Sequence, residues 1–197
     1  MDMKYYYVTH DEKYAQAYYE FEDGAEKKCP KCGKICEFSR IGVYHTRLKG
    51  KKQGDFYHAP GCYIGNSKFL EMLVKYNITG YEIKDIVVDG WFDQRDNLID
   101  LDSSDLKEIA ILGKCGWYAD KDGKEIKRCD KCGIINFSTR KEVKGIKVEE
   151  DTWDGSDIFS FSNWLGVMIC TERLKEACEK EKIKNIRFIP LEEFTFA

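Results

Sequence analysis

The segments KKCPKCGKICEFS (residues 27–39) and KRCDKCGIINFS (residues 127–138) decide how this chain is expected to fold. Each contains Cys-x-x-Cys-Gly behind a pair of basic residues, and each ends in Phe-Ser. Glycine after the second cysteine allows the positive φ angle that such a tight turn often needs. The inner cysteines of the two copies are 97 positions apart (129 − 32). The chain therefore contains one structural pattern twice, which we call the first and the second knuckle.

One knuckle supplies two thiolates, whereas a structural zinc ion takes four ligands in a tetrahedron. We therefore expect the two knuckles to meet around a single structural Zn²⁺. The resulting fold would be a zinc-ribbon arrangement with a long insertion between its knuckles. The expected ligands are Cys29, Cys32, Cys129 and Cys132.

Two other interpretations of the cysteines stay open. One is a thioredoxin-like redox role for either pair, which usually involves a single pair at the start of a helix. The other is two separate zinc sites. Their further ligands would be Cys36, His45, His58 and Cys62 in the first half, and Cys115 in the second.

Composition limits the class of protein. The chain has 197 residues, of which 43% are hydrophobic, and this predicts a folded core. The net charge of −3 does not suit a general nucleic-acid binder, because phosphate affinity rests on clustered Lys and Arg. The start, MDMKYYYVTHDEK, lacks the pattern of a secretory signal, and the longest apolar stretch, 164–170, is too short to span a bilayer. We expect a cytoplasmic protein without membrane contact, whose nine cysteines are reduced.

The similarity between the two copies extends beyond the cysteines. Ahead of each knuckle, aromatic residues, an Asp-Gly pair and a short charged stretch predict a hairpin. After each knuckle the hydrophobic spacing predicts a helix, over Ser67–Tyr76 and over Thr171–Lys182, with Ser67 and Thr171 as N-cap residues. A strand follows each helix, over residues 81–88 and 186–191. Gly80 and Asn185, just before these strands, are residue types that tolerate a left-handed turn.

The matching order of elements predicts an internally duplicated α+β protein. Two β-rich halves would each contain a zinc knuckle and a helix–strand unit, and would share one zinc near a two-fold axis. We place the N-terminal half at residues 1–90, an acidic connector at 91–108 and the C-terminal half at 109–197.

The doubled Cys-x-x-Cys-Gly pattern resembles the double-CxxCG motif family of bacterial proteins, members of which serve as immunity proteins in toxin systems. The ending is similar too: Trp-x-Gly-x-Asp-x-Phe (153–159), then Thr-Glu-Arg (171–173) opening a helix, then a short strand. The resemblance covers about residues 20–40 and 115–195. It implies a cytoplasmic, non-enzymatic protein that binds and neutralises a cognate toxin protein.

The sequence by itself agrees with a protein that is not an enzyme. It contains no glycine-rich phosphate loop, no His-Glu-x-x-His and no nucleophile elbow. A zinc ion held by four cysteines has no open coordination position for a substrate.

The connector offers a candidate surface for a partner. An acidic surface with aromatic anchors would suit the basic active site of a toxin that acts on nucleic acid. The candidate contact residues are Trp91, Asp93, Asp96, Asp100 and Asp102, and a second acidic run covers residues 149–157. The alternative is a solvated connector whose aspartates cap turns and helices, with residues 103–105 resembling a cap before LKEIA (106–110).

A second function class competes with toxin neutralisation. The basic residues of the knuckles would suit a zinc-ribbon nucleic-acid-binding or transcription-accessory module. The overall acidity and the lack of a recognition-helix pattern argue against it, so we expect the partner to be a protein.

Overall fold

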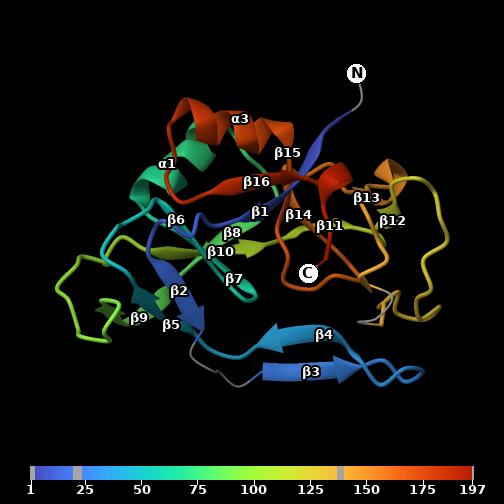
Figure 1. Ribbon diagram of the computed structural model, residues 1–197, viewed down its shortest axis with the longest axis horizontal. Helices are drawn as coiled ribbons and strands as arrows, with labels where there is room; N and C mark the ends of the chain where they lie inside the picture. The colour runs from blue at the N-terminus through green and yellow to red at the C-terminus, as the bar shows by residue number, and fades with distance from the viewer. Residues whose placement is uncertain (1–2, 20–23, 137–139, 197) are drawn as a thin grey trace.

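The computed structural model describes residues 3–19, 24–136 and 140–196 of the chain. The fold is α+β and mostly β. Two α-helices, α1 (Ser67–Lys75) and α3 (Glu172–Lys180), lie together on one side of the molecule. A long hairpin lies on the opposite side (Figure 1).

The larger of the two main sheets has five strands in the order β11-β14-β15-β1-β16. All neighbours are antiparallel except β11 and β14, which are parallel. The strands are β1 (Tyr5–Thr9), β11 (Gly113–Cys115), β14 (Ile158–Phe161), β15 (Ile169–Thr171) and β16 (Arg187–Pro190).

The other main sheet has four antiparallel strands in the order β6-β7-β10-β8. Its strands are β6 (Phe56–Ala59), β7 (Cys62–Gly65), β8 (Tyr81–Lys84) and β10 (Lys107–Ile111). Strand β1 thus lies among C-terminal strands, and β10 lies between β7 and β8, which both precede it in the chain.

The described residues also form three smaller sheets, in the orders β2-β5-β9, β3-β4 and β12-β13. Their strands are β2 (Gln16–Tyr19), β3 (Gly24–Lys28), β4 (Ile35–Arg40), β5 (Tyr44–Lys49), β9 (Ile86–Phe92), β12 (Ala119–Asp120) and β13 (Ile146–Lys147). Two 3₁₀ turns, η1 (Glu150–Thr152) and η2 (Leu191–Glu193), lie near the second half's strands.

The predicted hairpins ahead of the knuckles are not formed as expected. Strand β2 pairs with β5, and β3 pairs with β4, so the Asp-Gly pair does not join two paired strands in the first half. In the second half β12 pairs with β13. The reason is that the first knuckle itself is the turn of the β3–β4 hairpin. Asp23, of the first Asp-Gly pair, lies outside the described residues.

Both predicted helices are present, within two residues of the expected bounds. The N-cap of α1 is Asn66 rather than Ser67, because the Asn66 side chain accepts the hydrogen bond from the Phe69 N–H. Thr171 is the N-cap residue of α3, but its side chain makes no capping bond there. Gly80 and Asn185 have φ angles of 90° and 65°, which confirms the predicted left-handed turns.

Two further expectations about secondary structure are wrong. The strand predicted over residues 81–88 is divided into β8 and β9, which belong to different sheets. Residues 106–110, expected to follow a cap, lead into strand β10 instead of a helix. Asp105 does cap a helix, but it is α1, whose Ser67 N–H it accepts at 3.0 Å.

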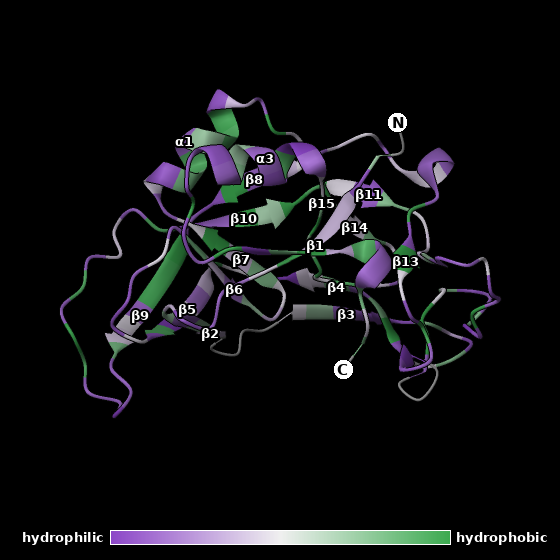
Figure 2. Cartoon of the chain, turned by 45° about the horizontal axis from the view of Figure 1, so that its top comes forward, coloured by the Kyte–Doolittle hydropathy of each residue, from purple (hydrophilic) through white to green (hydrophobic). Residues whose placement is uncertain are grey.

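The core divides into three clusters. The largest lies between the helices and the two main sheets and takes residues from both halves of the chain, including Val8, Phe69, Ile109 and Leu174. Hydrophobic residues alternate with more polar ones along the strands there, and both helices carry hydrophilic as well as hydrophobic residues (Figure 2). Cys170 and Cys178 are buried in this cluster, as expected for small apolar side chains. Within the described ranges, no helix has the length and apolar character needed to cross a membrane.

Candidate metal centre

The first knuckle is the turn between β3 and β4. The Gly33 N–H donates to the Cys29 carbonyl at 2.8 Å, and the Cys29 N–H donates to the Lys34 carbonyl at 2.8 Å. Gly33 has a φ angle of 72°, which residues with a side chain rarely adopt. These bonds close the turn and direct both thiols to the same side.

The second knuckle repeats this geometry on a less regular support. The Gly133 N–H donates to the Cys129 carbonyl at 2.8 Å, and the Cys129 N–H donates to Ile134 at 3.1 Å. Gly133 has a φ angle of 71°, and a Cβ atom at this position would lie 2.4 Å from the Trp117 ring. An isolated bridge between Arg128 and Ile135, rather than a pair of strands, continues the contact between the two sides of this knuckle.

The four thiols of the two knuckles form one cluster. Their sulfur atoms all lie within 4.8 Å of one another, with 3.9 Å from Cys29 to Cys129 and 3.6 Å from Cys32 to Cys132. Four sulfurs around a tetrahedral zinc ion, with Zn–S bonds of about 2.3 Å, have edges of about 3.8 Å. A disulfide would bring two sulfurs to about 2.05 Å. The spacing therefore fits one ion between four thiolates.

Hydrogen bonds and burial act differently on these thiols. The backbone N–H groups of Cys32 and Lys31 lower the pKa of Cys29 to about 6. The equivalent groups of Cys132 and Lys131 lower the pKa of Cys129. Loss of solvation raises the pKa of Cys132 to about 12 when no cation is near. Backbone hydrogen bonds thus favour the thiolate at the first cysteine of each knuckle, whereas poor solvation disfavours it at Cys132.

The basic residues around the centre are mostly engaged. The Lys31 Nζ lies 2.5 Å from Asp130, which joins the two knuckles by an ion pair. The Lys34 Nζ donates to the Ile135 carbonyl across the same boundary at 2.8 Å. Lys27 pairs with Glu37 at 2.6 Å within the first hairpin.

The remaining candidate ligands do not gather into a second site. Among residues 3–19, 24–136 and 140–196, the four-cysteine cluster is the one group of three or more His, Cys, Asp or Glu that could hold a metal ion. The Cys36 Sγ donates to the Lys27 carbonyl, and the Cys115 Sγ lies 3.5 Å from the Thr152 hydroxyl. His45 lies 3.0 Å from Asp89, and His58 stacks on Tyr63.

The acidic connector is mostly an exposed loop between β9 and β10, but its tryptophan is buried. Trp91 is only 3% exposed, packs in the cluster that contains Tyr57, and donates through Nε1 to the Gly50 carbonyl at 2.6 Å. Its ring is therefore part of the core and does not lie on the acidic surface with the aspartates. Substitution of Trp91 would disturb the fold before it reported on any partner.

Most aspartates of the connector form hydrogen bonds or ion pairs within the protein. Asp93 accepts the N–H groups of Arg95 and Asn97, which lower the pKa of its carboxyl group. Asp102 accepts the Ser104 N–H, and Asp96 pairs with Lys49 at 2.7 Å. Asp100 is exposed. Turn capping, one of the two interpretations of this run, is thus present at Asp93 and Asp102, and partner binding stays a prediction.

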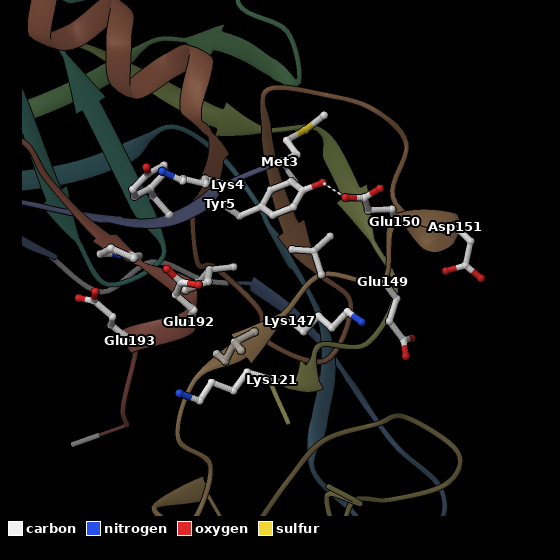
Figure 3. Close-up of a pocket in the computed structure, with 15 residues that line it drawn as sticks. Met3, Lys4, Tyr5, Lys121, Lys147, Glu149, Glu150, Asp151, Glu192 and Glu193 are labelled. Atoms are coloured by element: carbon white, nitrogen blue, oxygen red, sulfur yellow. Dashed lines mark hydrogen bonds between the residues drawn. The ribbon is translucent and has the colours of Figure 1, made fainter. Parts of the chain in front are cut away.

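One hollow lies away from the cysteines, over β1, β13, η1 and η2. It has a volume of about 1250 Å³ and is lined by charged side chains from distant segments. Figure 3 shows the carboxylates of Glu149, Glu150 and Asp151 on one side and those of Glu192 and Glu193 on the other. The Tyr5 hydroxyl donates to Glu150 at 3.3 Å. Three members of the second acidic run thus face a hollow rather than flat surface.

Two buried carboxylates were not anticipated from the sequence. Asp55 and Asp157 each precede a strand of a main sheet and accept several hydrogen bonds at the helix side of the molecule. The available signal was an Asp directly before an apolar strand in both halves, followed by a helix with Lys68 or Arg173 at its second position.

Comparisons with known proteins do not assign the chain. No protein-family model matches it, and no curated protein matches it.

Proposed function

We propose that this protein is a zinc-stabilised immunity protein of the cytoplasm, which binds a cognate bacterial toxin and neutralises it. The observation that carries the proposal is the union of both Cys-x-x-Cys-Gly segments in one four-thiol cluster. The resemblance to the double-CxxCG family depends on those two segments, so their convergence supports it.

The chemistry of the cluster favours a structural ion. Zinc bound by Cys29, Cys32, Cys129 and Cys132 would stabilise the fold. Four thiolates fill the tetrahedron, so no position remains for a substrate or an activated water. Function by binding, without catalysis, follows from such a closed site.

We also infer that the two halves arose by duplication. Both contain a knuckle with the same hydrogen bonds and a helix that ends in a left-handed turn before a strand. The shared metal would then lie between two related units.

Two acidic surfaces are candidates for contact with a basic toxin. One is the connector, where Asp96 and Asp100 are exposed, and the other is the hollow, where Glu149 and Glu192 are exposed. Exposed carboxylates attract a basic partner over a distance and speed association.

Co-expression with the toxin encoded beside the gene tests the proposal. We expect wild-type protein to protect cells and to form a complex with that toxin. The double variants Asp96→Lys/Asp100→Lys and Glu149→Lys/Glu192→Lys decide between the surfaces, because only the true contact surface should show slower association. If both variants associate as fast as wild type, neither surface contacts the toxin. If wild type forms no complex with the toxin, the immunity assignment is wrong for that pair.

The zinc-ribbon nucleic-acid module is the second candidate. It is favoured by the basic residues that line a hollow beside the knuckles, among them Lys34, Lys124, Lys127 and Arg128. It is weakened by the ion pair of Lys31 with Asp130 and by the carboxylates of Asp120 and Glu125 in the same lining. A steep dependence of DNA or RNA binding on salt concentration would favour this module, and absence of binding at low salt would exclude it.

A further inference from the structure

The two main sheets have corresponding strand orders. The order β6-β7-β10-β8 matches the order β14-β15-β1-β16. In each, the first two strands are followed along the chain by a helix and then by the strand at the other edge. The helices correspond with one offset, because both ends of α3 lie 105 positions after those of α1 (172 − 67 and 180 − 75).

The registers of the strands agree as well. In one sheet Tyr7 of β1 lies opposite Ile169 and Ile189. In the other, Glu108 of β10 lies opposite Ile64 and Lys84. The partners differ by 105 positions in both cases (169 − 64 and 189 − 84). Strands β1 and β10 therefore occupy equivalent places, each in the sheet of the other half.

Two buried carboxylates also connect each half to the other, at equivalent positions. Asp55 accepts the N–H of Lys184 at 2.8 Å, in the turn after α3. Asp157 accepts the N–H of Thr79 at 3.0 Å, in the turn after α1. Lys184 and Thr79 are also 105 positions apart (184 − 79). Each half thus uses one carboxylate to hold the helix end of the other half.

The cations beside these carboxylates likewise contact the opposite half at equivalent positions. Lys68, the second residue of α1, pairs with Asp55 and donates to the Lys182 carbonyl at 3.0 Å. Arg173, the second residue of α3, pairs with Asp157 and donates to the Tyr76 carbonyl at 2.7 Å. Each cation therefore joins its own half's carboxylate to the segment directly after the opposite helix.

We propose that residues 1–99 and 100–197 are two copies of one unit that have exchanged their first strands, so that neither half is complete without the other. This inference rests on the proposed duplication and is independent of toxin binding. Without β1, the C-terminal half would have unpaired edges on β15 and β16 in the middle of its sheet. Without β10, the N-terminal half would have the same gap between β7 and β8.

The exchange places the junction between the halves in the main core. Val8 of β1 and Ile109 of β10 both lie in the largest hydrophobic cluster, with residues of both helices. An apolar junction of this kind is typical of an obligate association, unlike the polar contacts between independent domains. The metal ion therefore joins halves that are already held together elsewhere.

Cleavage of the folded full-length protein tests this exchange. A protease site inserted after Asn97, in the exposed loop between β9 and β10, allows the chain to be cut once. The cut protein is then treated with EDTA and analysed by native mass spectrometry. We expect the two pieces to remain in one complex without metal and to separate only in denaturant. Separation into two folded pieces upon EDTA treatment would overturn the proposal, because it would show independent domains tethered by the ion.

Cross-linking of the uncut chain gives a second test that does not need the insertion. Thr9 lies opposite Arg187, and the equivalent Ala110 lies opposite Glu82. Peptide mapping after mild oxidation should find a disulfide in Thr9→Cys/Arg187→Cys and in Ala110→Cys/Glu82→Cys. The control Thr9→Cys/Glu82→Cys should give none. A disulfide in this control, with none in Thr9→Cys/Arg187→Cys, would show that β1 completes its own half and would refute the exchange.

Discussion

The two ends of the molecule join the same two halves in different ways. At the helix end, α1 and α3 lie together over a hydrophobic core, and the two aspartates Asp55 and Asp157 hold matching turns. At the metal end, a regular hairpin meets an irregular loop, and the principal meeting point is a set of four thiols. Many small contacts secure one end, whereas we expect the other to depend on one bound ion. A single substitution at the helix end should therefore remove only part of the free energy of unfolding. Loss of one thiol at the metal end should abolish metal binding.

The largest expected effect is loss of the metal. Cys132→Ser should release the ion, as should substitution of a cysteine in the other knuckle. At a metal concentration a thousandfold above its dissociation constant, bound metal stabilises a protein by about 4 kcal/mol, and this is lost. Thermal unfolding monitored by circular dichroism, with and without added zinc, measures the change.

Hydrogen exchange should show where this loss acts. Protection should fall in residues 24–40 and 124–136, while β7, β15 and both helices keep theirs. Cys36→Ser is the matched control, because Cys36 lies outside the four-thiol cluster and should leave metal content unchanged. Equal loss of protection throughout the chain would contradict the difference between the two ends.

The second effect concerns the helix end. Asp157→Ala removes hydrogen bonds to the Thr79 N–H and hydroxyl and to the Thr171 hydroxyl, together with the ion pair to Arg173. Because hydrogen bonds to a charged group contribute most when buried, we expect a loss of about 3 kcal/mol in the free energy of unfolding.

Urea denaturation measures this loss, and metal content provides the contrast. Asp157→Ala should still bind one metal ion, because its site is at the opposite end. A variant that keeps wild-type stability would show that the carboxylate does not hold the turn after α1.

The sequence predicted local features well and long-range pairing poorly. Helix positions, the left-handed turns at Gly80 and Asn185 and the four-cysteine cluster all follow from short patterns of residues. The placement of β1 and β10 could not be predicted, because a strand from either half can fill the place between the same two neighbouring strands. Trp91 was placed at the surface since it stands beside acidic residues, yet its neighbours in space come from β5, β6 and the turn at Gly50.

A third effect is the response to acid near the helix end. Burial lowers the pKa of His58 to about 4, helped by the nearby His10 ring. The unfolded chain therefore takes up a proton on His58 near pH 6.5, before the folded protein does. Protonation of His58 in the unfolded chain therefore lowers the free energy of unfolding as the pH drops from 6.5 towards 4, by about 1 kcal/mol per pH unit. Above pH 6.5 this loss is absent.

Comparison of pH profiles isolates this contribution. His58→Gln should unfold with a flatter dependence on pH between 6.5 and 4 than the wild type, in urea titrations at each pH. His45→Gln, at a more exposed position paired with Asp89, serves as the control. Identical slopes for His58→Gln and wild type would show that His58 is not held neutral by burial.

The smallest effect is expected from the ion pair between the knuckles. Lys31 and Asp130 are 2.5 Å apart, but both side chains are largely exposed, and exposed ion pairs contribute little to stability. Lys31→Ala should leave the thermal midpoint and the metal content unchanged within error. A large loss of metal in this variant would show that the ion pair, and not only the thiols, assembles the centre.

The shared metal centre is the central claim, and zinc K-edge X-ray absorption on intact protein of measured metal content tests it most directly. The structure predicts one ion per chain with four sulfur neighbours at about 2.3 Å. It also predicts that Cys29→Ser and Cys132→Ser each abolish binding of that ion. Two ions per chain, nitrogen among the neighbours, or a variant of one knuckle that keeps the full metal content would contradict a single centre shared by both halves.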